Sequence, residues 1–205
     1  SIPHYRKNID LQIEAYYSVF SAEDDVCLVL KTDLKKPAGR KLYDFEINLK
    51  QEILMLQSKY VNKIGGLPQI EIIQDKIPNM VSLYKSCDVL VNSASSEGFG
   101  LPLLEGLASG NLIVAPRCSG QLDFLNDQNA LLIDVKEIDA GKKYQYWYAT
   151  PGAKTYLPEI ESLSENLLNA YKNKNILKKQ FELETNRVVN KFTWENAARQ
   201  ILEIK

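Results

Sequence analysis

The chain has 205 residues and a formal net charge of −1, so it is long enough for one domain with a substantial core, and it lacks the overall positive charge that holds a nucleic acid backbone. Hydrophobic residues make up 45% and charged residues 25%, as in ordinary globular domains, and no apolar run approaches the roughly 18 residues of a membrane span. The three cysteines, Cys27, Cys87 and Cys118, lie far apart; they indicate neither a zinc site nor a disulfide framework, and free thiols fit the cytoplasm.

The first predicted element is a helix, because Ile9, Ile13, Tyr16 and Phe20 share one helical face. In an alternating α/β chain a strand should precede this helix, yet only Ser1–Tyr5 stand before it. We therefore expect the chain to be a piece of a longer protein; the alternative is a very short first strand.

Short apolar runs then alternate with helical patterns. The runs show no polar alternation, which is typical of parallel strands covered by helices on both faces. We expect right-handed βαβ units in a Rossmann-like, doubly wound α/β fold with a parallel sheet of about five or six strands. The predicted strands are Val26–Leu30, Ile70–Ile73, Asp88–Val91, Asn111–Val114 and Ala130–Ile133, and two further helices surround Ile47–Met55 and start at Pro78.

The C-terminal part differs from the rest of the chain. Lys136–Tyr156 is the longest irregular stretch, and its many aromatic residues predict a packed surface loop. Residues 157–205 are expected to form a helical tail, with Thr193 as the N-cap of a last helix.

The segment from Val89 to Ala108 carries the features of a ligand site. A buried strand ends near Asn92, a small polar run follows, and a helix begins at Leu101–Pro102. Glycines in the intervening loop let a ligand approach the backbone closely, and the free N–H groups at a helix start form an anion site. In open parallel sheets ligands bind at the carboxyl ends of the strands, where this loop lies.

Two carboxylates, Glu97 and Glu105, flank this anion site. Carboxylates repel phosphate but accept hydrogen bonds from sugar hydroxyls, each contributing about 1.5–3 kcal/mol. A diphosphate between two polyols, as in a nucleotide sugar, fits this layout. The plainer interpretation is an ordinary helix start, where acidic residues are common and a single Gly-x-Gly is weak support for a site.

The stretch Ser96–Ala108 resembles the signature of retaining glycosyltransferases of the GT-B fold, in the glycogen-synthase-like family 4 group (glycosyl transferases group 1). In that signature Glu-Gly-Phe-Gly-Leu-Pro is followed by a second glutamate eight positions after the first, as Glu105 follows Glu97 here. The resemblance extends over most of the chain, through Arg6–Asp10, Ile77–Asp88, Asn111–Pro116 and Gly120–Leu132.

The chain departs from the family pattern at three places. Gly106 stands where the family has alanine, which we expect to be harmless. Ser119-Gly120 replaces a pair of glycines, which would alter how that loop meets the sugar or phosphate. Ile2-Pro3-His4 stands in place of the usual Gly-Arg pair, so a basic diphosphate contact is not expected there.

The resemblance implies that residues 1–205 form a single nucleotide-sugar-binding domain, the C-terminal donor half of a GT-B enzyme, whose N-terminal acceptor domain lies outside this chain. It implies catalytic roles for Glu97, at the hexose hydroxyls, and for Arg6 and Lys7, at the diphosphate. The implied donor-binding residues are the loop that contacts sugar and phosphate through its backbone, the ribose ligand and the residue beside the base: Gly98, Phe99, Gly100, Leu101, Glu105 and Ile77.

The implied donor is a UDP or GDP sugar, with no metal and no other cofactor. His4 is the only histidine and has no ligand spacing around it, and the sequence contains no Asp-x-Asp pair, so positive side chains would take the place of a metal ion.

The resemblance further implies transfer of a hexose, with retention, to a glycan, lipid or protein acceptor, and inactivity of this chain alone. Membrane association of the whole protein stays open. The alternatives are a nucleotide-sugar epimerase of GT-B architecture and a non-catalytic nucleotide-binding α/β module.

Overall fold

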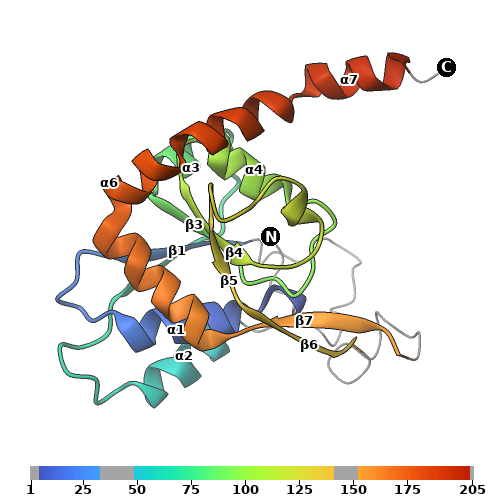
Figure 1. Cartoon of the computed structure of the whole chain (residues 1–205). Helices are drawn as coiled ribbons and strands as arrows, with labels where there is room; N and C mark the ends of the chain where they lie inside the picture. The colour runs from blue at the N-terminus through green and yellow to red at the C-terminus, as the bar shows by residue number, and fades with distance from the viewer. Residues whose placement is uncertain (1–4, 33–48, 141–151, 204–205) are drawn as a thin grey trace.

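The structure is a computed structural model that describes residues 5–32, 49–140 and 152–203. Strands and helices alternate as far as β5, and two helices form the C-terminal end (Figure 1). In chain order the elements are η1 (Tyr5–Lys7), α1 (Ile9–Val19), β1 (Cys27–Lys31), α2 (Leu49–Lys59), β2 (Gln69–Ile73), α3 (Met80–Ser86), β3 (Val89–Val91), α4 (Leu101–Ala108), β4 (Leu112–Pro116), η2 (Gly120–Asp123), β5 (Leu131–Ile133), β6 (Val135–Asp139), β7 (Lys154–Pro158), α6 (Ile160–Lys191) and α7 (Trp194–Glu203).

The five predicted strands all form, each within two residues of its expected bounds, as β1 to β5. Strand β1 pairs with β2, and β4 lies between β3 and β5, with every pair parallel. Backbone pairing among the described residues joins them as a group of two and a group of three, where we expected one sheet. The α/β, Rossmann-like fold class is confirmed.

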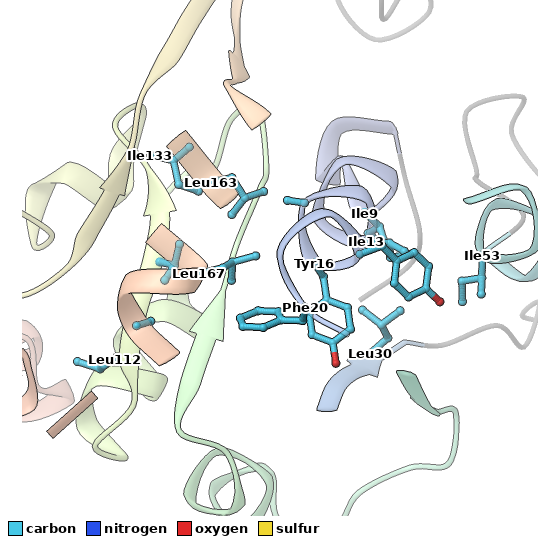
Figure 2. Close-up of a cluster of buried hydrophobic side chains, with 14 of the residues drawn as sticks. Ile9, Ile13, Tyr16, Phe20, Leu30, Ile53, Leu112, Ile133, Leu163 and Leu167 are labelled. Atoms are coloured by element: carbon cyan, nitrogen blue, oxygen red, sulfur yellow. The ribbon is translucent and has the colours of Figure 1, made fainter. Parts of the chain in front are cut away.

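Strand β4 explains the two-sided cover of the sheet, since all of its residues are buried. Successive side chains of a strand point to opposite faces. Leu112 and Val114 accordingly belong to a core shared with α1 and α6, whereas Ile113 and Ala115 belong to a second core with α4. Figure 2 shows the first core, where Leu163 of α6 lies beside the sheet. Full burial of a leucine or isoleucine contributes about 1.5–3 kcal/mol to stability. Strand β4 therefore stabilises the fold through both cores, since it contributes buried side chains to each.

Helix α6 connects the same two cores along its 32 residues. Leu163 and Leu167 pack in the first core, and Val188 packs in the second. A break in the helical dihedrals at Asn173 (φ −119°, ψ 17°) lies within the part of α6 that packs in the first core, since Leu177 and Phe181 beyond it belong to that core as well. The predicted helical tail is confirmed as α6 and α7, and Figure 1 shows α7 extending away from the sheet.

The prediction of an irregular loop over Lys136–Tyr156 is wrong in its described parts. Strands β6 and β7 pair antiparallel, with Val135 opposite Pro158, and β7 takes the first residues assigned to the helical tail. Their sequences, Val-Lys-Glu-Ile-Asp and Lys-Thr-Tyr-Leu-Pro, carry charges that a two-stranded ribbon tolerates, and they lack the continuous apolar run that marks a strand covered on both faces. The aromatic cluster at 144–148 lies outside the described residues.

The helix starts show local capping that the sequence indicates only in part. Helix α3 begins at Met80, not at Pro78, because the Asn79 side chain accepts a hydrogen bond from the Val81 N–H at 3.0 Å. Thr193 caps α7 as predicted, accepting from the Asn196 N–H at 3.1 Å. Ile47, expected in the second helix, lies outside the described residues.

Candidate functional site

The segment before α1 is joined to the loop after β3, although 85 or more residues separate them in the chain. The Ser95 N–H donates to the Arg6 carbonyl at 2.8 Å. The Ser93 hydroxyl donates to the carbonyls of Lys7 and Asn8, at 2.8 and 3.0 Å. These bonds bring the predicted cationic segment to the predicted ligand loop.

Three predicted residues, Arg6, Lys7 and Glu97, consequently form one ionic cluster. The Lys7 ammonium donates to the Glu97 carboxylate. The Arg6 guanidinium lies 3.4 Å from the same carboxylate and donates to the Ser96 carbonyl. The three side chains are 28%, 23% and 15% exposed, so they are partly shielded but reachable by a ligand. Two cations face one carboxylate, which leaves local positive charge.

The loop that follows Glu97 exposes backbone donors at the start of α4. Gly100 is the N-cap, and its φ of 87° and ψ of 44° require a residue that tolerates left-handed backbone, which is the reason for glycine here. Among the described residues, no hydrogen bond uses the N–H groups of residues 98–101. Four successive unpaired donors at a helix start favour an anion.

The Phe99 side chain serves to anchor this loop. Its ring packs on Phe124, with centroids 5.0 Å apart, and on Phe192 at the end of α6, at 5.7 Å. The side chain is thereby turned to the second core, and the predicted contact of Phe99 with a ligand can come only from its backbone.

Gly120 packs closely against the same loop, at residues 97 and 98. Its N–H donates to the Glu97 carbonyl at 3.2 Å, and a Cβ at this position would lie 1.9 Å from the Gly98 carbonyl oxygen. The second residue of the Ser119-Gly120 pair is thus required to be glycine. Ser119 itself has a φ of 64° and a ψ of −169°, a conformation that is nearly restricted to glycine.

Glu105 is exposed on α4, and the Tyr84 hydroxyl of α3 donates to its carboxylate at 2.8 Å. Burial of Tyr84, together with the Glu105 carboxylate, raises the pKa of the phenol above its ordinary value, so it remains a donor at neutral pH. The Asn111 amide fixes the end of α3 by donating to the carbonyls of Tyr84 and Cys87, at 2.8 and 2.6 Å. Glu105 is therefore held by one defined neighbour.

The described contacts leave one candidate apart from the rest: Ile77 is half-buried just before α3, and no hydrogen bond links it to the other candidates. Conversely, the structure adds Asn8, Tyr84 and Gly120 to the residues that organise the site. Asn8 follows the predicted cationic pair directly, and Tyr84 lies in the helix that was predicted to start at Pro78. Their sequence positions gave no sign of the polar partners they contact.

In the ranges that the structure describes, no group of three His, Cys, Asp or Glu side chains could hold a metal ion. Helices within those ranges are all too short or too polar to cross a membrane.

Solved structures of glycosyltransferases share this fold. A glycosyltransferase from Rickettsia africae is 18% identical, with a TM-score of 0.68, over 100% of this chain and 45% of its own. Sucrose-phosphate synthase from Thermosynechococcus elongatus is 17% identical, with a TM-score of 0.67, over 100% of this chain and 43% of its own. HepE from Anabaena, solved in complex with UDP, is 17% identical, with a TM-score of 0.61, over 100% of this chain and 47% of its own. The chain thus spans about half the length of these proteins.

A search of curated proteins found no match. A family model described as "Glycosyl transferases group 1" matches residues 4–147, which is well over half of the chain. That range contains the ionic cluster, the 98–101 loop and Glu105. The chain therefore belongs to the glycosyl transferases group 1 family.

Proposed function

We propose that this chain is the donor-binding half of a retaining hexosyltransferase that uses a nucleotide diphosphate sugar. The observation that carries the proposal is that Arg6 and Lys7 pair with Glu97, the residue directly before the unpaired N–H groups of residues 98–101. Cations and aligned amide dipoles at one place favour a polyanion, and a diphosphate satisfies both sets of donors. Residues 1–205 would then be one nucleotide-sugar-binding domain.

In the proposed complex, the diphosphate replaces Glu97 as the partner of Lys7 and Arg6. Their positive charges would stabilise the negative charge that grows on the diphosphate as the bond to the sugar breaks, which is the moment at which electrostatic contacts accelerate a reaction. Glu97, released from the two cations, would accept hydrogen bonds from hexose hydroxyls. No metal ion is needed in this scheme.

Glu105 would accept two hydrogen bonds from the ribose diol, oriented for that task by the Tyr84 hydroxyl. Ile77, just before α3, would lie at the base. The complex of HepE with UDP supports a uridine nucleotide as the first donor to test, with a guanosine nucleotide as the alternative. The chain covers 43–47% of the three solved proteins, which supports a separate N-terminal acceptor domain. The proposal places the whole enzyme in the cytoplasm, acting on a glycan, lipid or protein.

The test separates the two glutamates by ligand. A thermal-shift panel of UDP, GDP and ADP with their sugars first selects the base. Glu105→Gln should then lower the affinity for the nucleoside diphosphate and for the nucleotide sugar alike, by roughly 10-fold to 100-fold. The ribose is common to both ligands, and about 1.5–3 kcal/mol of charge-assisted hydrogen bonding is lost. Glu97→Gln should weaken binding of the nucleotide sugar only, because it removes the carboxylate that accepts from the hexose hydroxyls, and the nucleoside diphosphate has no hexose.

Calorimetry measures both affinities for each variant, and Glu182→Gln, exposed on α6, is the matched control that should change neither. Equal losses for both ligands in both site variants would reject the assignment. Release of free, epimerised sugar from the donor would favour the epimerase, and binding without turnover by the complete protein would favour the non-catalytic module.

A further inference from the structure

Asn8 occupies an unusual backbone position between the cationic pair and helix α1. Its φ of 45° and ψ of 47° are left-handed, and the residue is 1% exposed. Its carbonyl accepts the first hydrogen bond of α1, from the Gln12 N–H at 3.1 Å. Left-handed backbone favours glycine and, after it, asparagine and aspartate. Helix geometry alone would therefore be met at least as well by glycine.

The Asn8 side chain explains why glycine is not present. Its Nδ2 donates to the Ser93 carbonyl at 2.8 Å and to the Ser95 hydroxyl at 2.9 Å, which uses both amide hydrogens on one loop. The Ser93 hydroxyl returns bonds to the Lys7 and Asn8 carbonyls. A buried polar network with its donors satisfied is rigid, because each broken bond leaves a buried group without a partner.

This network has a direct geometric effect on the ionic cluster. Lys7 precedes Asn8, and Glu97 follows Ser95 by two residues, so the two chains that carry the cluster are clamped immediately beside it. The Arg6 and Lys7 side chains are long and lose entropy when they are fixed on a ligand. Clamping their backbone at a set distance from the 98–101 donors removes the additional cost of ordering the backbone when a ligand binds.

We propose that Asn8 is a positioning residue for the diphosphate: its amide holds Arg6 and Lys7 at the spacing from the 98–101 loop that lets both bind one diphosphate. The proposal rests on the proposed function, because the diphosphate is the ligand assigned there. It assigns to Asn8 no contact with the donor itself.

The experiment measures dissociation constants of UDP and GDP, each against its own monophosphate, for the wild-type chain and for Asn8→Gly. Glycine keeps the left-handed backbone, so the variant should still fold, with a melting temperature lowered by the loss of the two buried hydrogen bonds of the Asn8 amide. The diphosphate should bind roughly tenfold more weakly, while the monophosphate affinity changes little, so the preference for the diphosphate falls. A general loss of stability would lower the affinities for the diphosphate and the monophosphate by the same factor, and would leave that preference unchanged.

Two further variants complete the design. Ser95→Ala removes one acceptor of the Asn8 amide without changing residue 8, and should lower the same preference by a smaller factor. Asn166→Ala removes a comparable amide-to-carbonyl bond, to Leu132 at 3.1 Å in the α6–β5 contact, and should leave the preference unchanged. An unchanged preference in both Asn8→Gly and Ser95→Ala would overturn the positioning role while the proposed function stands. A wild-type chain that binds neither diphosphate would overturn both.

Discussion

Ser119 shows at the scale of one residue that this site contains backbone strain. With a φ of 64° and a ψ of −169°, it lies in a region of the φ/ψ map that side chains rarely enter, at a cost of about 1–3 kcal/mol. The neighbouring Gly120 must approach the Gly98 carbonyl, and this contact fixes the direction of the chain at Ser119. The strain at Ser119 results from the close packing of the Ser119-Gly120 turn against the loop at residues 97–101.

Ser119→Gly should therefore stabilise the chain. The gain should be about 1 kcal/mol, because relief of the strain is partly offset by the greater freedom of glycine in the unfolded state. Urea unfolding gives the free energy directly. Loss of stability would show that the serine side chain contributes more than its backbone conformation costs.

The two glycines in contact at this point should respond differently to alanine. A Cβ on Gly120 would overlap the Gly98 carbonyl, whereas a Cβ on Gly98 meets nothing within 4 Å. Gly120→Ala should destabilise the fold by about 2 kcal/mol or more through displacement of the loop. Gly98→Ala should fold normally but weaken nucleotide-sugar binding, because its methyl group lies where the ligand would approach. Melting temperatures and donor titrations check the pair, and equal melting temperatures would contradict the contact.

At the residue scale, the family resemblance selected Arg6, Lys7 and Glu97 as site residues, and the structure places their side chains together. Their roles stay predictions. The Asn8 clamp and the Tyr84–Glu105 bond were not expected, because each joins residues far apart in the chain and polar pairing leaves no periodic signal in one sequence.

At the scale of elements, helix α6 is the part that ties the domain together. It contacts α1, α4, β4 and β5, and near its end a polar group fastens it to the loop before β5. The Glu184 carboxylate accepts two bonds from Arg187, both at 2.6 Å, and one from the Asn126 amide at 3.0 Å. These donors, Arg187 foremost, hold the pKa of Glu184 at about 2, below its ordinary value of 4.5.

This shift predicts how acid affects the fold. A carboxyl group whose pKa is lower in the folded than in the unfolded state stabilises the fold above about pH 4.5, and that contribution is lost as the pH falls towards 2. Glu184→Gln should therefore melt below the wild type at pH 6, and the difference should shrink steadily to nothing near pH 2. Thermal melts at half-unit steps measure it. A difference that is constant with pH would show that packing, not charge, sets the effect.

The elements were predicted with uneven success for a physical reason. Strands β1 to β5 are apolar runs because helices cover them, and burial leaves a clear mark in sequence. Strands β6 and β7 lie in a separate two-stranded ribbon, where charged side chains are tolerated, so their sequences carry no continuous apolar run and predict a loop. The break in backbone pairing between the β1–β2 pair and the β3–β4–β5 group depends on three-dimensional spacing, which local patterns do not carry.

At the scale of the whole molecule, the two cores on either side of β4 support one edge, where the loop after β3, which leads into α4, meets the segment before α1. In the proposed enzyme this edge holds the donor, and the acceptor is held by a second domain. Catalysis by transfer requires both substrates in one orientation and water kept away from the activated sugar. This half of the proposed enzyme binds only the donor and therefore cannot orient the acceptor.

The most direct test of this account compares the chain with the longer protein at equal saturation by the donor sugar. We expect the two to bind the donor with similar affinity, and the chain alone to transfer no sugar, with at most slow donor hydrolysis supported by Arg6 and Lys7. Radiolabelled donor measures binding, hydrolysis and transfer in one assay. Comparable transfer rates would place the acceptor site within these residues, and absence of donor binding by the chain would contradict the account at its centre.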